Sequence, residues 1–257
     1  MISSSDVQFL SKTEPDPPHA DFPNGWGGFA DAMHVDFKIP SEHLINGKRY
    51  DAEMQVFHLH PDRRRMPTQA TVIQATDNGY NWYFEGALKA FEFVFERDEA
   101  ICAQSIRRER QMLAEAHANL GGEASGEDID YSTWADYSTV MERPGYREYA
   151  ENMERSLQDG RWDPHHEMLC PSIHFYRYEG SLTEPPCGEW VSWFITDTPM
   201  TISTDQLNRM KNILFNHVDY GCRRTSVHYN HSVARPVQPT SGRPIYLCTE
   251  ADYGPDP

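Results

Sequence analysis

The chain has 257 residues, of which 39% are hydrophobic and 12% aromatic, and its formal net charge is -16. This length and composition suit one large globular domain. No apolar stretch is long enough to span a bilayer, and the acidic excess repels nucleic acid. We therefore expect one soluble domain over residues 1–257, with no membrane span and no nucleic-acid partner.

The compartment cannot be read from the sequence. The first residues, MISSSDVQFLSKTEPDPP, lack the basic start and the apolar run of a secretory signal. Either the protein is intracellular or its true beginning is missing, in which case a secretory or organellar origin stays open. Five scattered cysteines are too few for a disulfide framework or a CxxC metal site, and their odd number leaves at least one thiol unpaired.

The first third of the chain predicts β-structure. Residues 1–30 contain four prolines and a GWGG segment, which favour loops. Apolar and polar residues then alternate over 33–39 and again over 49–60, on either side of an Asn46-Gly47 turn. This pattern predicts an antiparallel hairpin. The run ATVIQA (70–75) predicts a further strand, and FEGALKAFEFVF (84–95) a helix or a helix leading into a strand.

Residues 98–160 have a helical character. Apolar residues recur at helical spacing until Gly121-Gly122, at positions Cys102, Ile106, Leu113, Ala116 and Leu120. An acidic Gly/Ser segment follows, and a second short helix is predicted over 146–157. Strand patterns return at 172–180, 189–196 and 243–248. The order is strands, a helical insertion over 98–160, then strands.

Three segments resemble one known family. YEGSLTEPPCGEWVSW (178–193) resembles the signature of α-type carbonic anhydrases, PSEHLINGKRYDAEM (40–54) their Ser-Glu-His turn and following strand, and NHSVARPVQPTSGRPI (230–245) their C-terminal segment. The resemblance covers roughly 5–95 and 160–250. It implies a mainly β fold with a large twisted, mostly antiparallel sheet and peripheral helices. It also implies that the N-terminal portion of the family is absent, together with the proton-shuttling histidine.

The zinc ligands of the family are absent from this sequence. The resemblance places the three zinc-binding histidines at Asp36, Lys38 and Gln55. A lysine ammonium has no lone pair for a metal, and a neutral glutamine oxygen is a poor zinc ligand. We therefore expect no metal and no catalytic residue in this pocket. Without zinc, no bound water is acidified to a near-neutral pKa.

Other pocket residues are predicted to serve the fold. Lys38 is expected to take the place of the metal and to pair with Asp36 or Glu53; the alternative is that it extends outward into water. Thr183 and Glu42 match the family's residues that orient zinc-bound hydroxide, and we interpret them as a structural hydrogen bond. Phe57 is expected to narrow the pocket.

The histidines carry weaker expectations. A displaced metal site of His34, Asp36 and Glu53 is geometrically conceivable, but Lys38 beside it would repel the ion. His58 and His60 are expected to pack or form hydrogen bonds, because strand alternation places them on the opposite face from Gln55. His165 and His166 are expected to lie in solvent.

Two functional hypotheses remain. The first is a catalytically inactive carbonic anhydrase-like protein that acts as a binding or scaffolding module, with a protein partner or a second copy bound through the 98–160 insertion. The second is a carbonic anhydrase that hydrates CO2 with zinc held by unconventional ligands, or a subunit or fragment of a larger assembly. We further expect Ile106, Leu113 and Leu120 to be buried, against the sheet or against a second subunit.

Overall fold

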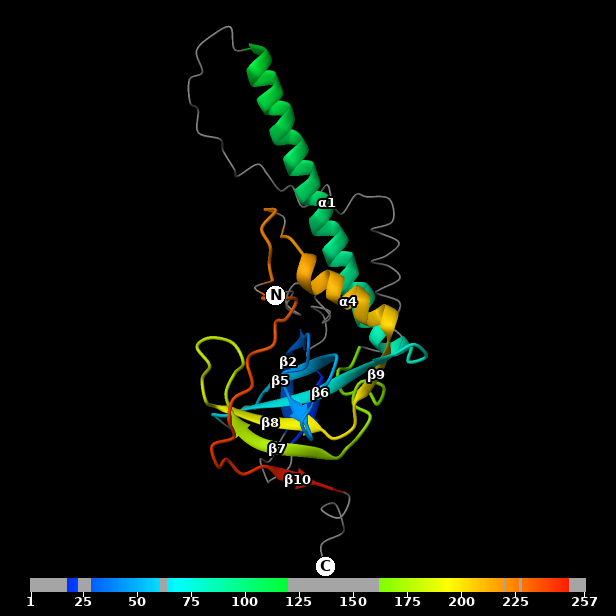
Figure 1. Cartoon of the computed structure of the whole chain (residues 1–257), viewed down its shortest axis with the longest axis vertical. Helices are drawn as coiled ribbons and strands as arrows, with labels where there is room; N and C mark the ends of the chain where they lie inside the picture. Colours follow the sequence, from blue (N-terminus) through cyan, green and yellow to red (C-terminus); the bar gives the residue numbers. More distant parts are fainter. Residues whose placement is uncertain are drawn as a thin grey trace, which may run out of the picture.

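The computed structural model describes residues 18–22, 29–60, 64–119, 162–219, 221–226 and 228–249, and the side chains of 113–119 are not described. This part of the chain forms one eight-stranded sheet, a two-stranded ribbon and two helices (Figure 1). The predicted mainly β fold is therefore confirmed. Within the described residues, no helix is long and apolar enough to cross a membrane.

The sheet is mixed, with mostly antiparallel pairs. Its path runs β1-β2-β5-β6-β8-β7-β10, and β9 also pairs with β6. The pairs β6–β8 and β6–β9 are parallel and the other five are antiparallel. The strand bounds are β1 His19–Asp21, β2 Phe29–Lys38, β5 Ala52–Leu59, β6 Met66–Thr76, β7 Phe175–Gly180, β8 Val191–Thr196, β9 Met200–Ser203 and β10 Tyr246–Cys248.

The predicted hairpin is present, with a small ribbon at its end. β2 pairs antiparallel with β5, and Asp36 lies opposite Gln55. Between them, β3 (Leu44–Ile45) and β4 (Lys48–Arg49) pair around Asn46 and Gly47, which have φ values of 52° and 77°. An Asn-Gly pair adopts this left-handed backbone at little cost, which explains the turn.

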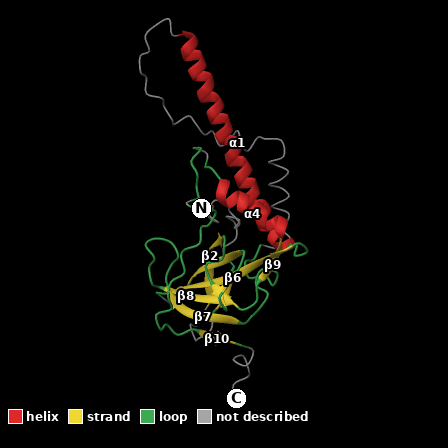
Figure 2. Ribbon diagram, viewed as in Figure 1, coloured by secondary structure: helices red, strands yellow, loops and turns green. Residues whose placement is uncertain are grey.

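The two helices pack together on one side of the sheet (Figure 2). α1 spans Trp82–Asn119 and α4 spans Thr204–Asn216. Their buried apolar residues, among them Phe84, Leu88, Met210 and Ile213, form one core cluster with Met54 of β5. Arg209 of α4 pairs with Glu85 and Glu92 of α1, joining the helices at their surface.

The structure changes the boundary of the predicted helix. The apolar runs at 84–95 and after residue 98 belong to one 38-residue helix, α1, which begins at Trp82 rather than near 98. The predicted helix over 146–157 and Leu120 lie outside the described residues, and so does the side chain of Leu113. Ile106 is 39% exposed, so the expected burial of this residue against the sheet is wrong.

Two strands and one helix have no counterpart in the sequence interpretation. These elements are β1, β9 and α4. The start of α4 carries a capping box: Ser203 Oγ accepts from Gln206 N, and Gln206 Oε1 accepts from Ser203 N. The Ser-x-x-Gln spacing, followed by Leu207, Met210 and Ile213, was therefore an available signal for this helix.

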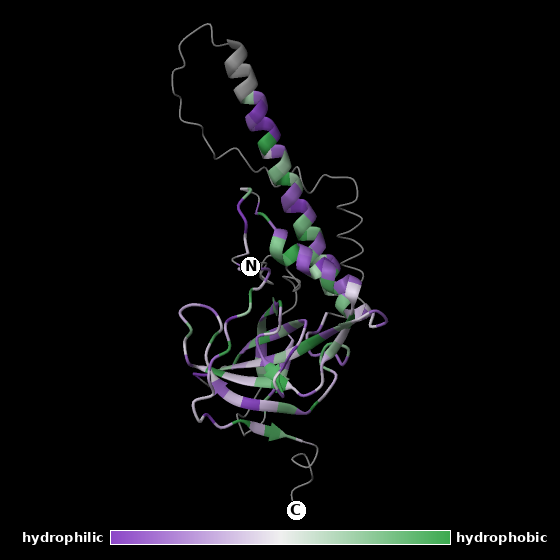
Figure 3. Cartoon of the chain, in the orientation of Figure 1, coloured by the Kyte–Doolittle hydropathy of each residue, from purple (hydrophilic) through white to green (hydrophobic). Residues whose placement is uncertain are grey.

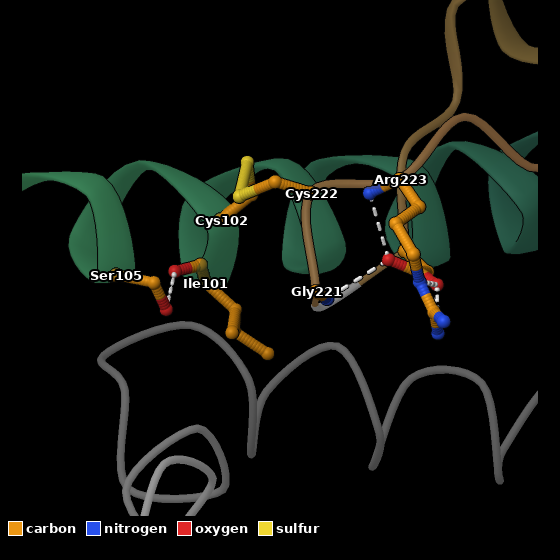
Figure 4. The surroundings of a disulfide bond; sticks show 7 residues. Ile101, Cys102, Ser105, Gly221, Cys222 and Arg223 are labelled. Atoms are coloured by element: carbon orange, nitrogen blue, oxygen red, sulfur yellow. Dashed lines mark hydrogen bonds and ion pairs between the residues drawn. A yellow bond between two sulfur atoms is a disulfide. The ribbon is translucent and has the colours of Figure 1, made fainter. Parts of the chain in front are cut away.

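The middle of α1 is fastened to the chain that follows α4. Cys102 forms a disulfide with Cys222, with Cα atoms 5.0 Å apart (Figure 4). One turn earlier, Asp98 Oδ2 lies 3.1 Å from His217 Nε2, at the C-cap of α4. Beyond these contacts α1 extends away from the sheet and mixes hydrophilic with hydrophobic residues (Figure 3).

Candidate functional site

The positions matched to the zinc ligands lie together on two neighbouring strands. Asp36 and Lys38 are on β2, and Gln55 is on β5 opposite Asp36. The three are 6%, 4% and 0% exposed. They share one face because side chains two residues apart on a strand point the same way. The structure thus brings the predicted pocket residues together.

Lys38 is held inside this pocket. Its Nζ donates a hydrogen bond to Glu184 Oε1 at 2.5 Å and lies 3.5 Å from Asp36 Oδ2. Burial opposes the charge, but Asp36 and Glu184 more than offset it and raise the pKa of Lys38 above its ordinary value. Lys38 is therefore an ammonium at neutral pH. It pairs with Asp36 as expected, while its second partner is Glu184 rather than Glu53.

Gln55 uses its amide nitrogen to connect two glutamates. Nε2 donates to Glu42 Oε2 at 2.9 Å and to Glu53 Oε1 at 2.8 Å. Both partners are acceptors, which settles the orientation of the amide. The expected bond between Glu42 and Thr183 is replaced: Glu42 accepts from Gln55 and, through Oε1, from the backbone N–H of Arg235 at 2.8 Å.

Glu53 and His43 form a buried hydrogen-bonded pair behind Gln55. His43 Nδ1 lies 2.7 Å from Glu53 Oε1, and Glu53 Oε2 accepts from the backbone N–H groups of Glu42 and His43. Burial opposes both charges, but each partner offsets it, so the pKa of Glu53 is lowered and that of His43 is raised. His43 Nε2 also meets Tyr178 Oη at 2.7 Å.

The loop that follows β7 closes the pocket. Thr183 and Glu184 belong to this loop, which contains the cis peptide bond Pro185-Pro186. A cavity of about 480 Å³ begins at Asp36, Lys38 and this loop and continues along apolar residues of α1 and α4. A second cavity of about 480 Å³, lined by Glu42, His43 and Tyr178, meets the first at Thr183.

The remaining pocket residues fill space. His34 stacks on Phe57 with ring centroids 4.5 Å apart. Phe57 in turn meets Trp193 edge to face, with ring centroids 6.1 Å apart. Phe57 is 3% exposed, and its expected narrowing of the pocket stays a prediction. Glu53, the third member of the displaced metal site considered above, is engaged by His43 and Gln55.

These residues do not fit zinc. The Lys38 ammonium offers only N–H donors, and Gln55 directs its N–H groups at two carboxylates. Asp36 Oδ1 and Gln55 Oε1 are buried acceptors without a partner among the described residues, but two oxygens beside a cation make a poor zinc site. In the described part of the chain, no three His, Cys, Asp or Glu side chains are placed to hold a metal.

Three histidines outside the pocket can also be placed. His58 and His60 are buried on and just after β5, and His58 forms hydrogen bonds, as expected. The expectation that His165 lies in solvent is wrong: its side chain is 17% exposed and its Nε2 lies 2.8 Å from His58 Nε2. Glu184 and Tyr178 were not among the predicted site residues, although both lie inside the 178–193 motif.

Comparisons with known proteins agree with the motifs. The family profile described as eukaryotic-type carbonic anhydrase matches residues 139–249. A carbonic anhydrase of Pectobacterium atrosepticum is 35% identical over 78 residues, covering 30% of this chain and 26% of the relative. Alpha carbonic anhydrase 8 of Arabidopsis thaliana is 27% identical over 209 residues, covering 81% of this chain and 35% of the relative. Dioscorin DB3S of Dioscorea polystachya is 23% identical over 212 residues, covering 82% of this chain and 53% of the relative.

Among solved structures, the α-carbonic anhydrase of Thermovibrio ammonificans is 20% identical with a TM-score of 0.47, covering 85% of this chain and 63% of that one. Dioscorin complexed with ascorbate is 17% identical with a TM-score of 0.46, covering 85% and 62%. The chain thus spans between about a quarter and about half of the length of the three curated relatives described above. On these sequence matches, the chain is similar to α-type carbonic anhydrases, by the family profile over residues 139–249 and by the relative of Arabidopsis thaliana over 209 residues.

Proposed function

We propose that this chain is a non-catalytic member of the carbonic anhydrase family that acts as a binding or scaffolding module. The observation that carries the proposal is the Lys38 ammonium, buried and held between Asp36 and Glu184. It occupies one of the three positions matched to the zinc ligands. An internal ion pair there places a positive charge beside Asp36 and Glu184 without a metal.

The surface of α1 supports the binding role. Ile106 and Met112, in the half of the helix that extends away from the sheet, are 39% and 52% exposed (Figure 1). Exposed apolar side chains on a helix that stands clear of the sheet suit contact with another protein or a second copy of this chain. The Cys102–Cys222 disulfide ties the middle of this helix to the loop after α4.

The proposal is tested on the purified chain of 257 residues. Metal analysis should find less than one tenth of a zinc ion per chain, and stopped-flow CO2 hydration should stay at the buffer background with or without added zinc. One tightly bound zinc per chain with a sulfonamide-sensitive rate would establish the alternative, an enzyme with unconventional ligands. Bound zinc without measurable CO2 hydration would refute only the claim that the pocket holds no metal, and would leave the non-catalytic role standing.

The binding role needs its own measurement. Light scattering of the same preparation gives the mass of the particle, to be compared with 29.7 kDa for one chain. A multiple of this mass that shifts to the single-chain value in Ile106→Glu would support contact through α1. A multiple that the substitution leaves unchanged would place the contact elsewhere.

A further inference from the structure

Two histidine rings face each other between β5 and the segment 162–170. His58 is fully buried on β5, and His165 lies in the segment that precedes β7. Their Nε2 atoms are 2.8 Å apart, with ring centroids 5.0 Å apart and an angle of 30° between the ring planes. A separation of 2.8 Å between two nitrogens is a hydrogen-bond distance, so one of the two must carry a proton.

The outer nitrogens of both rings meet oxygens that only accept hydrogen bonds. His165 Nδ1 lies 3.0 Å from Asp163 Oδ1, and His58 Nδ1 lies 3.2 Å from the carbonyl oxygen of Pro67. The hydrogen bond from His165 lowers the pKa of Asp163, which keeps this carboxylate ionised and acceptor-only. Each Nδ1 must therefore carry a proton to make its bond.

Counting the protons gives the charge of the pair. The two Nδ1 atoms require one proton each, and the contact between the Nε2 atoms requires a third. Two neutral imidazoles carry only two protons, and with both on Nδ1 the Nε2 lone pairs would point at each other. A complete set of hydrogen bonds therefore needs one positive charge on the pair, which Asp163 balances.

We propose that His165 is held as an imidazolium that donates to Asp163 and to His58, and that this bound proton latches the segment 162–170 to β5. The third proton belongs on His165 because burial, followed by the charge of His165 itself, lowers the pKa of His58 to about 3. His58 is thus neutral, donates through Nδ1 and accepts through Nε2. The proposal does not depend on whether the chain binds zinc or a partner.

The side chains next to the two histidines do not change this assignment of the proton. His34 has a smaller electrostatic effect that also lowers the pKa of His58. Cys170 is held by Gln69 and the Pro164 carbonyl, and burial raises its pKa to about 11, so it stays a thiol. His166 stacks on Tyr83, with ring centroids 3.8 Å apart.

The latched segment has neighbours of its own. The backbone N–H of Asp163 donates to Tyr83 Oη, and Asn81 Nδ2 donates to the Met168 carbonyl. Both contacts lie at the beginning of α1. Loss of the proton as pH rises removes one hydrogen bond and sets two lone pairs against each other. The folded state then loses stability at the point where the chain returns from the insertion to the sheet.

Imidazole NMR of the full chain with ¹⁵N-labelled histidine tests the protonation directly. At pH 6 we expect both nitrogens of one ring, assigned through His165→Gln, to carry protons, and a second ring, His58, to be a neutral Nδ1–H tautomer. A His165 ring with one proton at pH 6 would overturn the proposal. Zinc titrated alone provides a second check. One zinc ion bound per wild-type chain and none in His165→Gln would also overturn the proposal, because the two facing histidine nitrogens would then be metal ligands.

Thermal unfolding between pH 5.5 and 8.5 tests the latch. The Tm of wild type should fall as pH rises above about 6.5, the ordinary value of an imidazole in the unfolded chain, because the unfolded chain then no longer holds the proton that the folded chain binds. His165→Gln should have a lower Tm at pH 5.5 and a clearly flatter pH dependence, whereas the matched control His19→Gln, at an exposed residue of β1, should keep the wild-type slope. Equal slopes in wild type and His165→Gln would overturn the latch even if the NMR result held.

Discussion

Cys102 and Cys222, 120 residues apart in the sequence, form a disulfide that ties the middle of α1 to the loop after α4. The three other cysteines, Cys170, Cys187 and Cys248, are thiols. Titration of the denatured, unreduced chain should therefore find three thiols, and titration after reduction five. Five thiols before reduction in protein purified under air would contradict the bond.

Removing this disulfide should weaken the fold. Because it closes a loop of about 120 residues in the unfolded chain, Cys102→Ser with Cys222→Ser should lower the free energy of unfolding by about 2–4 kcal/mol. Urea unfolding followed by circular dichroism measures the change. The matched control is Cys187→Ser, one of the unbonded thiols, whose effect should stay within about 0.5 kcal/mol. Equal stability of the double variant and wild type would show that the bond constrains nothing.

The buried ion pair of Lys38 should also be measurable. Lys38→Met leaves Asp36 buried without its cation, which should cost about 3–5 kcal/mol in the free energy of unfolding. Adding Asp36→Asn should recover a large part of this loss, since the uncompensated charge is gone. Lys48→Met, at an exposed lysine, is the control and should change stability by less than about 0.5 kcal/mol. A Lys38→Met variant as stable as the control would show that Lys38 extends into water.

The pocket should accept zinc once ligands are restored. The triple variant Asp36→His, Lys38→His, Gln55→His places three imidazoles on one face of β2 and β5. Glu42 and Glu53 remain beside them to hold the new rings. Calorimetry should show one zinc ion bound per chain, against none in wild type. A well-folded triple variant with no affinity for zinc would count against the matched positions.

The pair of Glu53 and His43 predicts the dependence of stability on acid. Because the pKa of Glu53 is lowered in the folded state, its contribution is present above the unfolded value of about 4.3 and is lost as pH falls through the folded pKa. The raised pKa of His43 acts in the opposite sense, so its contribution is lost as pH rises through that value. The stability that the pair contributes is therefore greatest between about pH 4.3 and 6.5, the values of glutamate and histidine in the unfolded chain.

Urea unfolding at pH 7 and pH 3.5 checks this on Glu53→Gln. The variant should lose about 1.5–3 kcal/mol at pH 7 and less at pH 3.5, because pH 3.5 lies below the pKa of about 4.3 of a glutamate in the unfolded chain, which then binds a proton. Glu99→Gln, at an exposed residue of α1, should follow the wild-type pH dependence. A constant difference between wild type and Glu53→Gln at both pH values would mean that the charge of Glu53 contributes nothing.

The exposed half of α1 makes a prediction about the monomer. Ile106→Glu should leave the Tm unchanged to within about 2 °C, because the side chain is 39% exposed and supports no core in this chain. Gln104→Glu, an exposed neighbour, controls for added charge. A large loss of Tm in a monomeric Ile106→Glu variant would show that the residue is buried after all.

The sequence alone determined the elements whose patterns are local. Alternation over 33–39 and 49–60 and the Asn46-Gly47 turn predict the hairpin, because strand period and turn chemistry depend only on neighbouring residues. The resemblance of the 40–54 segment to the family placed Asp36, Lys38 and Gln55 in one pocket, and the structure brings them together. What Lys38 contacts, however, depends on a loop 146 residues away, which no local pattern encodes.

Only the tertiary structure decided the remaining relationships. The sequence interpretation divided α1 near residue 98, because helical periodicity shows which face is apolar but not where one helix ends and another begins. Cys102 and Cys222 carry no spacing signal, and a disulfide forms between them because packing brings α1 beside the loop after α4. His165 was predicted to lie in solvent because adjacent histidines in a loop usually do, yet its ring lies between His58 and Asp163. Proton positions follow from which acceptors meet in space, and only the folded chain specifies that.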